Sequence, residues 1–423
     1  MKKLLKKVIS LSIVFTFAFS SLVYGADIVE ESDMKKLDTV TSIAEETWSD
    51  TASLRKASIK KASSDFEIKT IKTYGKLMDY LEDEEEIQAV PPAEEDYPDG
   101  AYVEFEAPKT GNMVLQILSD RDNSDEEIKI TQRTLDGSLI KTVCKDMSAN
   151  EVVLSYVPVK ANVTYALCFS SMKKGDVYGI KAAVVPGGTS GTLSTSSNTE
   201  KFAIASGTDM NRKAYTTYWK MTAKKNGRLT VAAQDIYSAS KSVKVTLCNS
   251  KKKAISATTT MSSSGDAVAN ACYGISGASK GTVYYVKVQT SAPIYAVGYK
   301  LTGYTAKAGT SKSKATSISK GKSKSSVLAA STSTGSQWYK VKLTKNKSFR
   351  IDFKGTIAPG TSVKMQLLKT DGKSNLKKIT MKGAMNTTNT GYIKGKVSKT
   401  GTYYVKISKG SAKSSAAYKL SYK

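Results

Sequence analysis

The stretch Gly281-Thr-Val-Tyr-Tyr-Val-Lys-Val288 returns near the end of the chain as Gly401-Thr-Tyr-Tyr-Val-Lys-Ile407. A short distance after each copy come an aromatic residue, a lysine and a leucine, at Tyr299-Lys300-Leu301 and at Tyr418-Lys419-Leu420. Apolar and polar residues alternate within both stretches, and this period of two is typical of a β-strand with one buried face. The repeat therefore predicts pairs of strands in copies of one small β module.

Three segments of the chain follow the same plan, with an opening strand, a short turn, two further strands and a closing strand. The opening strands are expected at 102–105, 218–221 and 338–343, and the closing strands at 165–169, 284–288 and 403–407. Asp371-Gly372 in the third segment is a strong hairpin signal. Short strands at steady spacing with polar turns predict an all-β fold of three tandem antiparallel β-sandwich modules of jelly-roll-like form.

The amino-terminal residues differ from the modules. A basic start, an apolar run over 8–23 and a small residue at Ala26 are typical of a secretory signal peptide, so residues 1–26 are expected to be removed and the protein secreted. The apolar run is short for a membrane span and no second one follows. Residues 27–99 predict an acidic leader, partly helical around 37–52 and 68–81 or else disordered. The modules are expected at 100–186, 197–304 and 312–423.

An aromatic opening strand, an apolar second strand, and a closing Gly-x-Tyr-Tyr-Val-x-Val followed by Tyr-x-Leu resemble the bacterial pre-peptidase C-terminal domain. That domain is a secreted, jelly-roll-like β-sandwich related in fold to the collagen-binding domains of clostridial collagenases. The resemblance covers roughly residues 100 to 423 and is best in modules two and three. It implies an accessory, non-catalytic module. Such domains usually follow a peptidase, which this chain does not show, so the resemblance does not imply a role in targeting a protease.

The formal net charge of +27 is unevenly distributed. Residues 27–185 carry 19 Lys or Arg against 31 Asp or Glu, whereas residues 186–423 carry 41 against 6. In the last module, Asp352 and Asp371 alone oppose a dense lysine population. Such a field attracts anionic polymers, for example teichoic acid, acidic polysaccharide, lipid headgroups or nucleic acid. A lysine-rich surface that is simply solvated explains the same charge.

Four cysteines fall into two pairs with equal spacing, Cys144 with Cys168 and Cys248 with Cys272. Each pair lies within one module, and in a secreted protein this pattern is compatible with two intramodular disulfides. The pairs do not occupy matching points of the repeat, so the equal spacing is partly accidental and free thiols are the alternative. The distance between the paired residues decides between the two.

Catalytic motifs are weak in this chain. The absence of histidine removes the commonest general base and the commonest zinc ligand. Ser-x-x-Lys matches begin at Ser53, Ser58 and Ser238, and Lys-Thr-Gly matches begin at Lys109 and Lys399. No Ser-Asp-Asn element accompanies them, and a chain rich in Ser, Thr and Lys makes such matches by chance. We therefore expect no enzymatic activity and no cofactor.

The best candidate for a metal site is the acidic stretch 120–127, where Asp120, Asp122, Asp125 and Glu127 offer oxygen ligands for Ca²⁺. It lacks the glycine and the distal glutamate of the EF-hand pattern, and the equivalent loops of the other modules hold almost no carboxylates. We therefore expect a solvated acidic loop and no metal ion.

The outward faces of the strands offer the best candidate for a binding site. If Val341, Leu343, Val405 and Ile407 point into the core, the residues between them point outward. The residues predicted to point outward are Trp338, Lys340, Lys342, Tyr404 and Lys406 in module three, and Tyr218, Lys220, Tyr285 and Lys287 in module two. Rings beside ammonium groups form a platform for sugar rings or for an anionic fibre. Alternatively, these rings cover a sandwich edge or pack between modules, because tyrosine is common on β surfaces.

Together these features predict a secreted, non-catalytic, adhesin-like binding protein. Its basic modules two and three would attach to anionic or glycan polymers of the cell envelope or extracellular matrix. The alternative is a structural surface or matrix component that self-associates, acidic amino-terminal part to basic carboxyl-terminal part, without a specific ligand. Binding that weakens with salt favours the first interpretation, and concentration-dependent assembly without a ligand favours the second.

Overall fold

The computed structural model describes residues 60–63, 66–90, 96, 100–120, 128–148, 151–188, 190–193, 202–225, 227–236, 241–261, 275–278, 280–303, 308–384 and 387–423. The expected signal peptide and the expected helix at 37–52 lie outside these residues. Within the described ranges, the search for a helix long and apolar enough to cross a membrane finds none.

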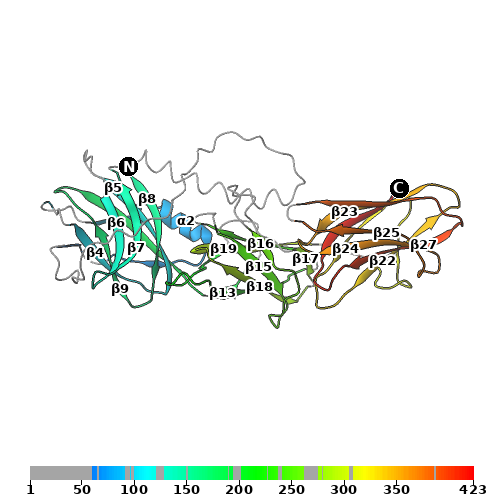
Figure 1. Cartoon of the computed structure of the whole chain (residues 1–423), viewed down its shortest axis with the longest axis horizontal. Coiled ribbons are helices and arrows are strands. Elements are labelled where there is room, and N and C mark those ends of the chain that lie inside the picture. Colours follow the sequence, from blue (N-terminus) through cyan, green and yellow to red (C-terminus); the bar gives the residue numbers. More distant parts are fainter. Residues whose placement is uncertain are drawn as a thin grey trace. The chain divides into compact units, whose positions relative to one another are not determined.

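The described strands form six sheets, which pair into three sandwiches (Figure 1). We call these sandwiches modules 1, 2 and 3. Module 1 has the sheets β1-β4-β9-β6-β7 and β2-β10-β5-β8, and β3 also pairs with β10. Its strands are β1 (Lys60–Ser63), β2 (Lys69–Thr70), β3 (Gln88–Val90), β4 (Ala101–Glu106), β5 (Gly111–Asp120), β6 (Ile128–Thr134), β7 (Leu139–Met147), β8 (Val152–Val159), β9 (Thr164–Phe169) and β10 (Val177–Pro186).

Module 2 has the sheets β11-β13-β18-β15-β16 and β12-β19-β14-β17. Its strands are β11 (Gly191–Thr192), β12 (Ala203–Ser206), β13 (Thr216–Thr222), β14 (Gly227–Asp235), β15 (Val243–Cys248), β16 (Thr259–Met261), β17 (Ile275–Ala278), β18 (Val283–Thr290) and β19 (Ile294–Gly303).

Module 3 has the sheets β20-β22-β27-β24-β25 and β21-β28-β23-β26. Its strands are β20 (Thr316–Ser317), β21 (Ser323–Leu328), β22 (Ser336–Leu343), β23 (Phe349–Ile357), β24 (Ser362–Leu368), β25 (Asn375–Lys382), β26 (Asn389–Gly395), β27 (Gly401–Lys409) and β28 (Ala416–Tyr422).

The strand order is the same in all three modules, which confirms the all-β, sandwich-like fold class. In each module the first strand runs parallel to the opening strand, as β1 does to β4, β11 to β13 and β20 to β22. The closing strands β9, β18 and β27 lie in the middle of their sheets, between the opening and the third strand. The repeated Tyr-Tyr-Val-Lys stretch therefore lies, in modules 2 and 3, on a strand that is paired on both sides. By its contacts the chain divides into two compact units, one ending at Pro186 and one comprising Gly187 onward with Thr73–Gly75.

Part of the expected leader is built into module 1. Within residues 60–90, β1 pairs with β4, and β2 and β3 both pair with β10. Helix α2 (Tyr74–Glu82) overlaps the expected helix at 68–81, and a 3₁₀ turn, η3 (Glu84–Glu86), follows it. These strands are two to four residues long, too short for alternation to reveal them in the sequence.

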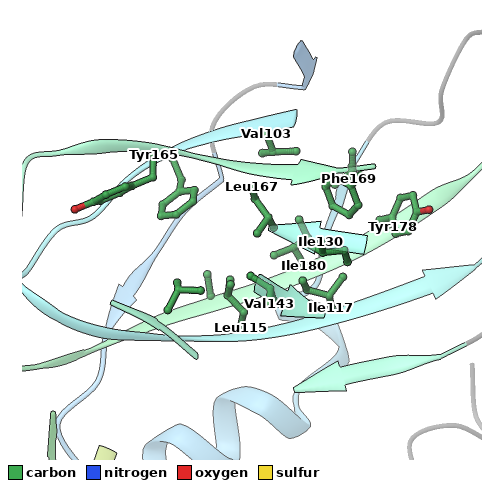
Figure 2. Packing of buried hydrophobic residues seen from close by; sticks show 14 of the residues in the cluster. Val103, Leu115, Ile117, Ile130, Val143, Tyr165, Leu167, Phe169, Tyr178 and Ile180 are labelled. Carbon is green, nitrogen blue, oxygen red and sulfur yellow. The ribbon is translucent and has the colours of Figure 1, made fainter. Parts of the chain in front are cut away.

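Alternating side chains of facing sheets form the cores. In module 1, Val103, Leu167 and Phe169 of one sheet meet Leu115 and Ile180 of the other (Figure 2). Full burial of each such side chain contributes about 1.5–3 kcal/mol of hydrophobic stabilisation. Modules 2 and 3 add a buried polar link, since Trp219 Nε1 donates to the Tyr295 hydroxyl at 3.0 Å and the hydroxyls of Tyr339 and Tyr418 lie 2.9 Å apart. These bonds satisfy the polar atoms of large rings that would otherwise be costly to bury.

A disulfide between Cys144 and Cys168 is not formed, and both thiols are free. Cys144 lies on β7 and Cys168 on β9, with β6 between them. Two strand spacings amount to roughly 9.5 Å, beyond the roughly 7 Å that a disulfide can span. The two side chains also face opposite sides of the sheet, because Cys144 packs against the core and Cys168 packs with Tyr102. Cys248 is a free thiol, and Cys272 lies outside the described residues.

Candidate binding faces of modules 2 and 3

The outward residues of module 3 lie where strand alternation predicts. Tyr339, Val341 and Leu343 of β22 are buried in the core, and so are Val405 and Ile407 of β27. The side chains between them lie on the opposite side of the sheet. Lys340 and Lys342 are exposed, whereas Trp338, Tyr404 and Lys406 are half-buried. We call this surface, the outer side of β22, β27 and β24, the front face of module 3.

Strand pairing places a ring opposite a lysine in two consecutive outward-facing rows of the front face. Trp338 of β22 pairs with Lys406 of β27, and Lys340 of β22 pairs with Tyr404 of β27. The two rings therefore lie on different strands and diagonally from one another, each beside an ammonium group. Side chains directly opposite in an antiparallel pair are about 4.5–5.5 Å apart at Cβ, and diagonal neighbours are also within reach of aromatic side chains. Lys406 Nζ lies 5.1 Å from the centre of the Trp338 ring, a cation–π contact.

Module 2 repeats this arrangement at the same positions. Tyr218 of β13 pairs with Lys287 of β18, and Lys220 pairs with Tyr285. Tyr218, Tyr285 and Lys287 are half-buried, and Lys220 is exposed. We call the outer side of β13, β18 and β15 the front face of module 2. The sequence predicted these four residues to point outward, and strand pairing adds that two of them match the Trp338–Lys406 pair.

In both modules an additional lysine lies near the closing-strand tyrosine, in or next to the turn after the third strand. In module 2, Lys252 Nζ lies 4.8 Å from the centre of the Tyr218 ring and 5.5 Å from that of Tyr285. The Asn249 side chain accepts hydrogen bonds from the backbone N–H groups of Lys251 and Lys253, both at 3.0 Å, and so fixes this turn. Lys252 itself has a positive φ of 58°. The turn thus directs one ammonium group between the two rings.

In module 3 the corresponding lysine comes from outside the turn. Lys312 Nζ lies 5.2 Å from the centre of the Tyr404 ring and donates to the backbone oxygen of Asp371 in the β24–β25 turn. The Asp371-Gly372 hairpin signal is borne out, since Gly372 has a φ of 69° and the Asp371 carboxylate caps the turn. The sequence did not reveal the roles of Lys252 and Lys312, because a turn's side-chain direction is not carried by strand alternation.

The two carboxylates of module 3 are both engaged. Asp352 accepts from Arg350 Nε at 2.6 Å and from Lys423 Nζ at 2.7 Å. Burial would raise the pKa of Asp352, but the hydrogen bonds from Lys423 and Arg350 outweigh burial and lower it. Asp371 accepts from the hydroxyl of Ser374 at 2.6 Å and from backbone N–H groups of the turn, which lowers its pKa to about 2. Asp352 and Asp371 are the two acidic side chains of module 3, so they compensate only a small part of its lysine charge.

The corresponding face of module 1 is closed. At the positions of Trp338 and Lys406 it carries Tyr102 and Cys168, which are opposite each other on β4 and β9. Tyr102 is 5% exposed and Cys168 is 7% exposed, and Leu135 from the β6–β7 turn packs on them. Arg133, also buried, donates to the backbone oxygen of Gly137 at 2.6 Å. This face is packed and offers no open ring.

A further exposed ring lies on the second sheet of module 3. Tyr392 of β26 is 47% exposed. The guanidinium carbon of Arg350 lies 4.3 Å from the centre of its ring, and Lys394 Nζ lies 5.6 Å away. This ring was not among the residues predicted from the sequence, although the buried Ile393 after it indicates that Tyr392 and Lys394 point outward.

The weaker motifs stay unassigned. Most of the acidic stretch at Asp120–Glu127 lies outside the described residues, as do Ser53, Ser58 and Ser238. Lys109 and Lys399 lie in turns directly before β5 and β27, as expected of chance Lys-Thr-Gly matches. A search of the described part of the chain for three or more clustered metal-ligating side chains finds no such group.

No protein-family model matches the chain, so the resemblance to the pre-peptidase C-terminal domain stays a prediction. No curated protein matches its sequence. Among solved structures, the tandem CBM22 domains of Xyn10C from Paenibacillus barcinonensis align at 10% identity and a TM-score of 0.18, covering 53% of this chain and 87% of theirs.

Two other structures align over more of the chain. The triple jelly roll of an archaeal virus aligns at 9% identity and a TM-score of 0.16, covering 76% of this chain and 82% of its own. ZmpB of Clostridium perfringens, a catalytic domain with two CBM51 domains, aligns at 9% identity and a TM-score of 0.16, covering 78% of this chain and 34% of its own. At such TM-scores these likenesses carry no argument, and the fold description rests on the sheet topology given above.

Proposed function

We propose that the protein is a secreted, non-catalytic binding protein whose front faces in modules 2 and 3 hold a linear anionic polysaccharide of the cell envelope or extracellular matrix. The observation that carries this proposal is the ring-and-lysine arrangement, which occurs at the same strand positions in both modules. Module 1 shares the topology and lacks the arrangement. The proposal that the protein acts outside the cell rests on its basic and then apolar amino-terminal sequence.

The chemistry of the front face suits a polymer that has both sugar rings and anionic groups. Aromatic rings stack on the apolar faces of sugar rings, and ammonium groups bind sulfate, phosphate or carboxylate oxygens. Lys406 at 5.1 Å from the Trp338 ring and Lys312 at 5.2 Å from the Tyr404 ring hold charge beside both platforms. A purely ionic ligand would not need the rings, and a neutral glycan would not need the lysines.

The sheet supplies a rigid base for such a site. Trp338 and Tyr404 project from strands that are paired on both sides, and the residues next to them, Tyr339 and Val405, are 0% exposed. Little side-chain freedom remains to be lost on binding, and a preorganised surface of this kind favours affinity.

The test is retention of the protein on immobilised heparin across a salt series, with cellulose as a neutral glycan and polyphosphate as a polyanion without sugar. We expect retention on heparin to persist at salt on the order of 0.5 M, where charge alone is strongly screened. Replacing Tyr218, Tyr285, Trp338 and Tyr404 together by alanine should weaken heparin binding more than tenfold, since each ring contact contributes about 0.5–1.5 kcal/mol.

Tyr156→Ala in module 1 is the control, because Lys141 Nζ lies 3.1 Å from the centre of that ring but the two residues come from β7 and β8, strands of different sheets that do not pair with each other. It should leave binding unchanged. Equal retention on heparin and polyphosphate, abolished by salt and indifferent to the four alanine replacements, would show that charge alone acts and would overturn the proposal.

A further inference from the structure

We propose that module 3 carries a second binding surface for the same class of polymer on its other sheet, so that this one module holds two polymer segments at once. The inference rests on the function proposed above and adds a site that the front face does not contain. We call this second surface the back face of module 3. It is the outer side of β23, β26 and β28, and it is made by Arg350, Lys354, Tyr392, Lys394 and Lys419.

The pairing of the strands places these side chains together. Asp352 of β23 pairs with Tyr392 of β26 on one side and with Ser421 of β28 on the other. In the next outward rows, Arg350 pairs with Lys394, and Lys354 pairs with Lys419. The exposed ring therefore lies in a central row with basic side chains in the rows on both sides of it.

Asp352, the single carboxylate of the back face, does not make this face a binding surface for cations. Asp352 is bound by Arg350 at 2.6 Å and by Lys423 at 2.7 Å, and the hydrogen bonds from those two groups lower its pKa. Asp352 therefore stays ionised at neutral pH and compensates part of the charge of its two partners. Lys354, Lys394 and Lys419 remain exposed and have no carboxylate partner among the described residues of module 3.

Two cationic side chains lie near the ring of Tyr392 and leave much of this residue exposed. Arg350 lies 4.3 Å and Lys394 lies 5.6 Å from its centre, yet the residue is 47% exposed. An exposed ring flanked by donors repeats the chemistry of the front face, where Lys406 lies 5.1 Å from the Trp338 ring. The same ligand class, an anionic polysaccharide, therefore suits both faces.

The two faces cannot share one binding position. They are the outer sides of two sheets that enclose the core containing Val341, Ile351 and Phe353. Sheets of a sandwich pack about 10 Å apart, and their outer surfaces point in opposite directions. A short polymer segment bound on the front face is thus out of reach of Tyr392. With one long polymer on each face, module 3 would link two polymer molecules.

The back face is a property of module 3 within the described structure. In module 1 the same surface of β10 lies under α2, where Lys181 Nζ donates to the backbone oxygens of Tyr80 and Leu81. In module 2 the ring of Phe202 lies on Gly298 of β19, so closely that a Cβ at this glycine would meet it at 1.9 Å. A surface left open in one of three otherwise matching modules indicates that its ring and lysines serve contact with a partner.

The test is the number of heparin-derived octasaccharides bound per chain, measured by isothermal titration calorimetry. The starting protein is the full chain with Tyr218→Ala, Lys252→Gln and Tyr285→Ala, which removes the front face of module 2. We expect it to bind two octasaccharides. Tyr392→Ala with Lys394→Gln should reduce this to one by weakening the second site at least tenfold, and Trp338→Ala with Lys406→Gln should likewise leave one.

The control is Lys345→Gln with Lys347→Gln, two exposed lysines of the β22–β23 turn, which removes one charge more than either site variant and should still leave two octasaccharides bound. Lys354→Gln with Lys419→Gln changes the back face without touching its ring and should also weaken one site. A single octasaccharide that is lost with Trp338→Ala and kept with Tyr392→Ala would overturn this inference while leaving the proposed function standing. No binding at all would overturn this inference together with the function proposed for the front face of module 3.

Discussion

Modules 1 and 3 have the same strand order, yet matching positions on their first sheets are buried in module 1 and accessible in module 3. Where module 3 has the half-buried Trp338 opposite Lys406, module 1 has the buried Tyr102 opposite Cys168. A turn carrying Leu135 packs on the module 1 face. In this fold, therefore, apolar contacts can cover the outer side of a sheet or charged residues can keep it exposed, without any change in topology.

The second sheets show the same contrast. Lys181 of β10 in module 1 is 1% exposed. Its ammonium group donates to the carbonyl oxygens of Tyr80 at 3.2 Å and Leu81 at 3.0 Å, and also to that of Asp83, at the end of α2. Lys419 of β28, the strand in the same place of module 3, is exposed. One lysine fastens a helix to its sheet, and the other faces solvent.

The largest expected difference between the two modules is in the free energy of unfolding, and it is expected from Lys181→Met. The apolar side chain keeps much of the packing but leaves the last carbonyl groups of α2 without their donor, at a cost of about 2–4 kcal/mol. Calorimetry should show the transition of the first unit falling by roughly 5–10 °C. Lys419→Met is the matched control and should stay within about 0.5 kcal/mol of the parent, as exposed substitutions usually do. Equal effects of the two changes would refute the contrast.

A smaller effect is expected at the matching ring positions. Tyr102→Ala removes a ring that is 5% exposed and should destabilise module 1 by about 2–3 kcal/mol, because it leaves a cavity beneath Leu135. Trp338→Ala removes a half-buried ring and should destabilise module 3 by less. Heparin retention should respond in the reverse order, falling with Trp338→Ala and unaffected by Tyr102→Ala. A Tyr102→Ala variant that is stable but no longer binds would reverse our assignment of the two faces.

The sequence predicted which side chains of the front faces point outward, since a period of two decides both sides of a strand at once. It could not predict which residues meet across strands, because the Trp338–Lys406 and Tyr218–Lys287 pairs depend on the strand order of the folded sheet. Nor could it predict Lys252, whose place over two rings is decided by the conformation of a turn.

Two parts of the fold were not predicted from the sequence, for different reasons. The strands contributed by residues 60–90 are too short to show alternation, and their place in module 1 depends on pairing with β4 and β10, far along the chain. The back-face strand β26 begins Asn389-Thr-Gly-Tyr and ends at Gly395. Glycine and threonine there weaken the apolar pattern, so Ile393 alone marked the buried side.

The smallest expected effect is on the rate of chemical modification of two side chains. Cys168 and Lys406 occupy the same position in modules 1 and 3. Burial raises the pKa of Cys168 to about 12. At pH 8 its thiol is therefore protonated, and only the thiolate reacts with alkylating agents. Mass spectrometry after iodoacetamide treatment of the folded protein should find Cys168 unmodified, and modified once the protein is unfolded. Lys406, half-buried on an open face, should be acetylated in the folded protein and protected by bound heparin. Rapid alkylation of Cys168 in the folded state would mean that the face of module 1 opens, and the two modules would then differ in their residues but not in their accessibility.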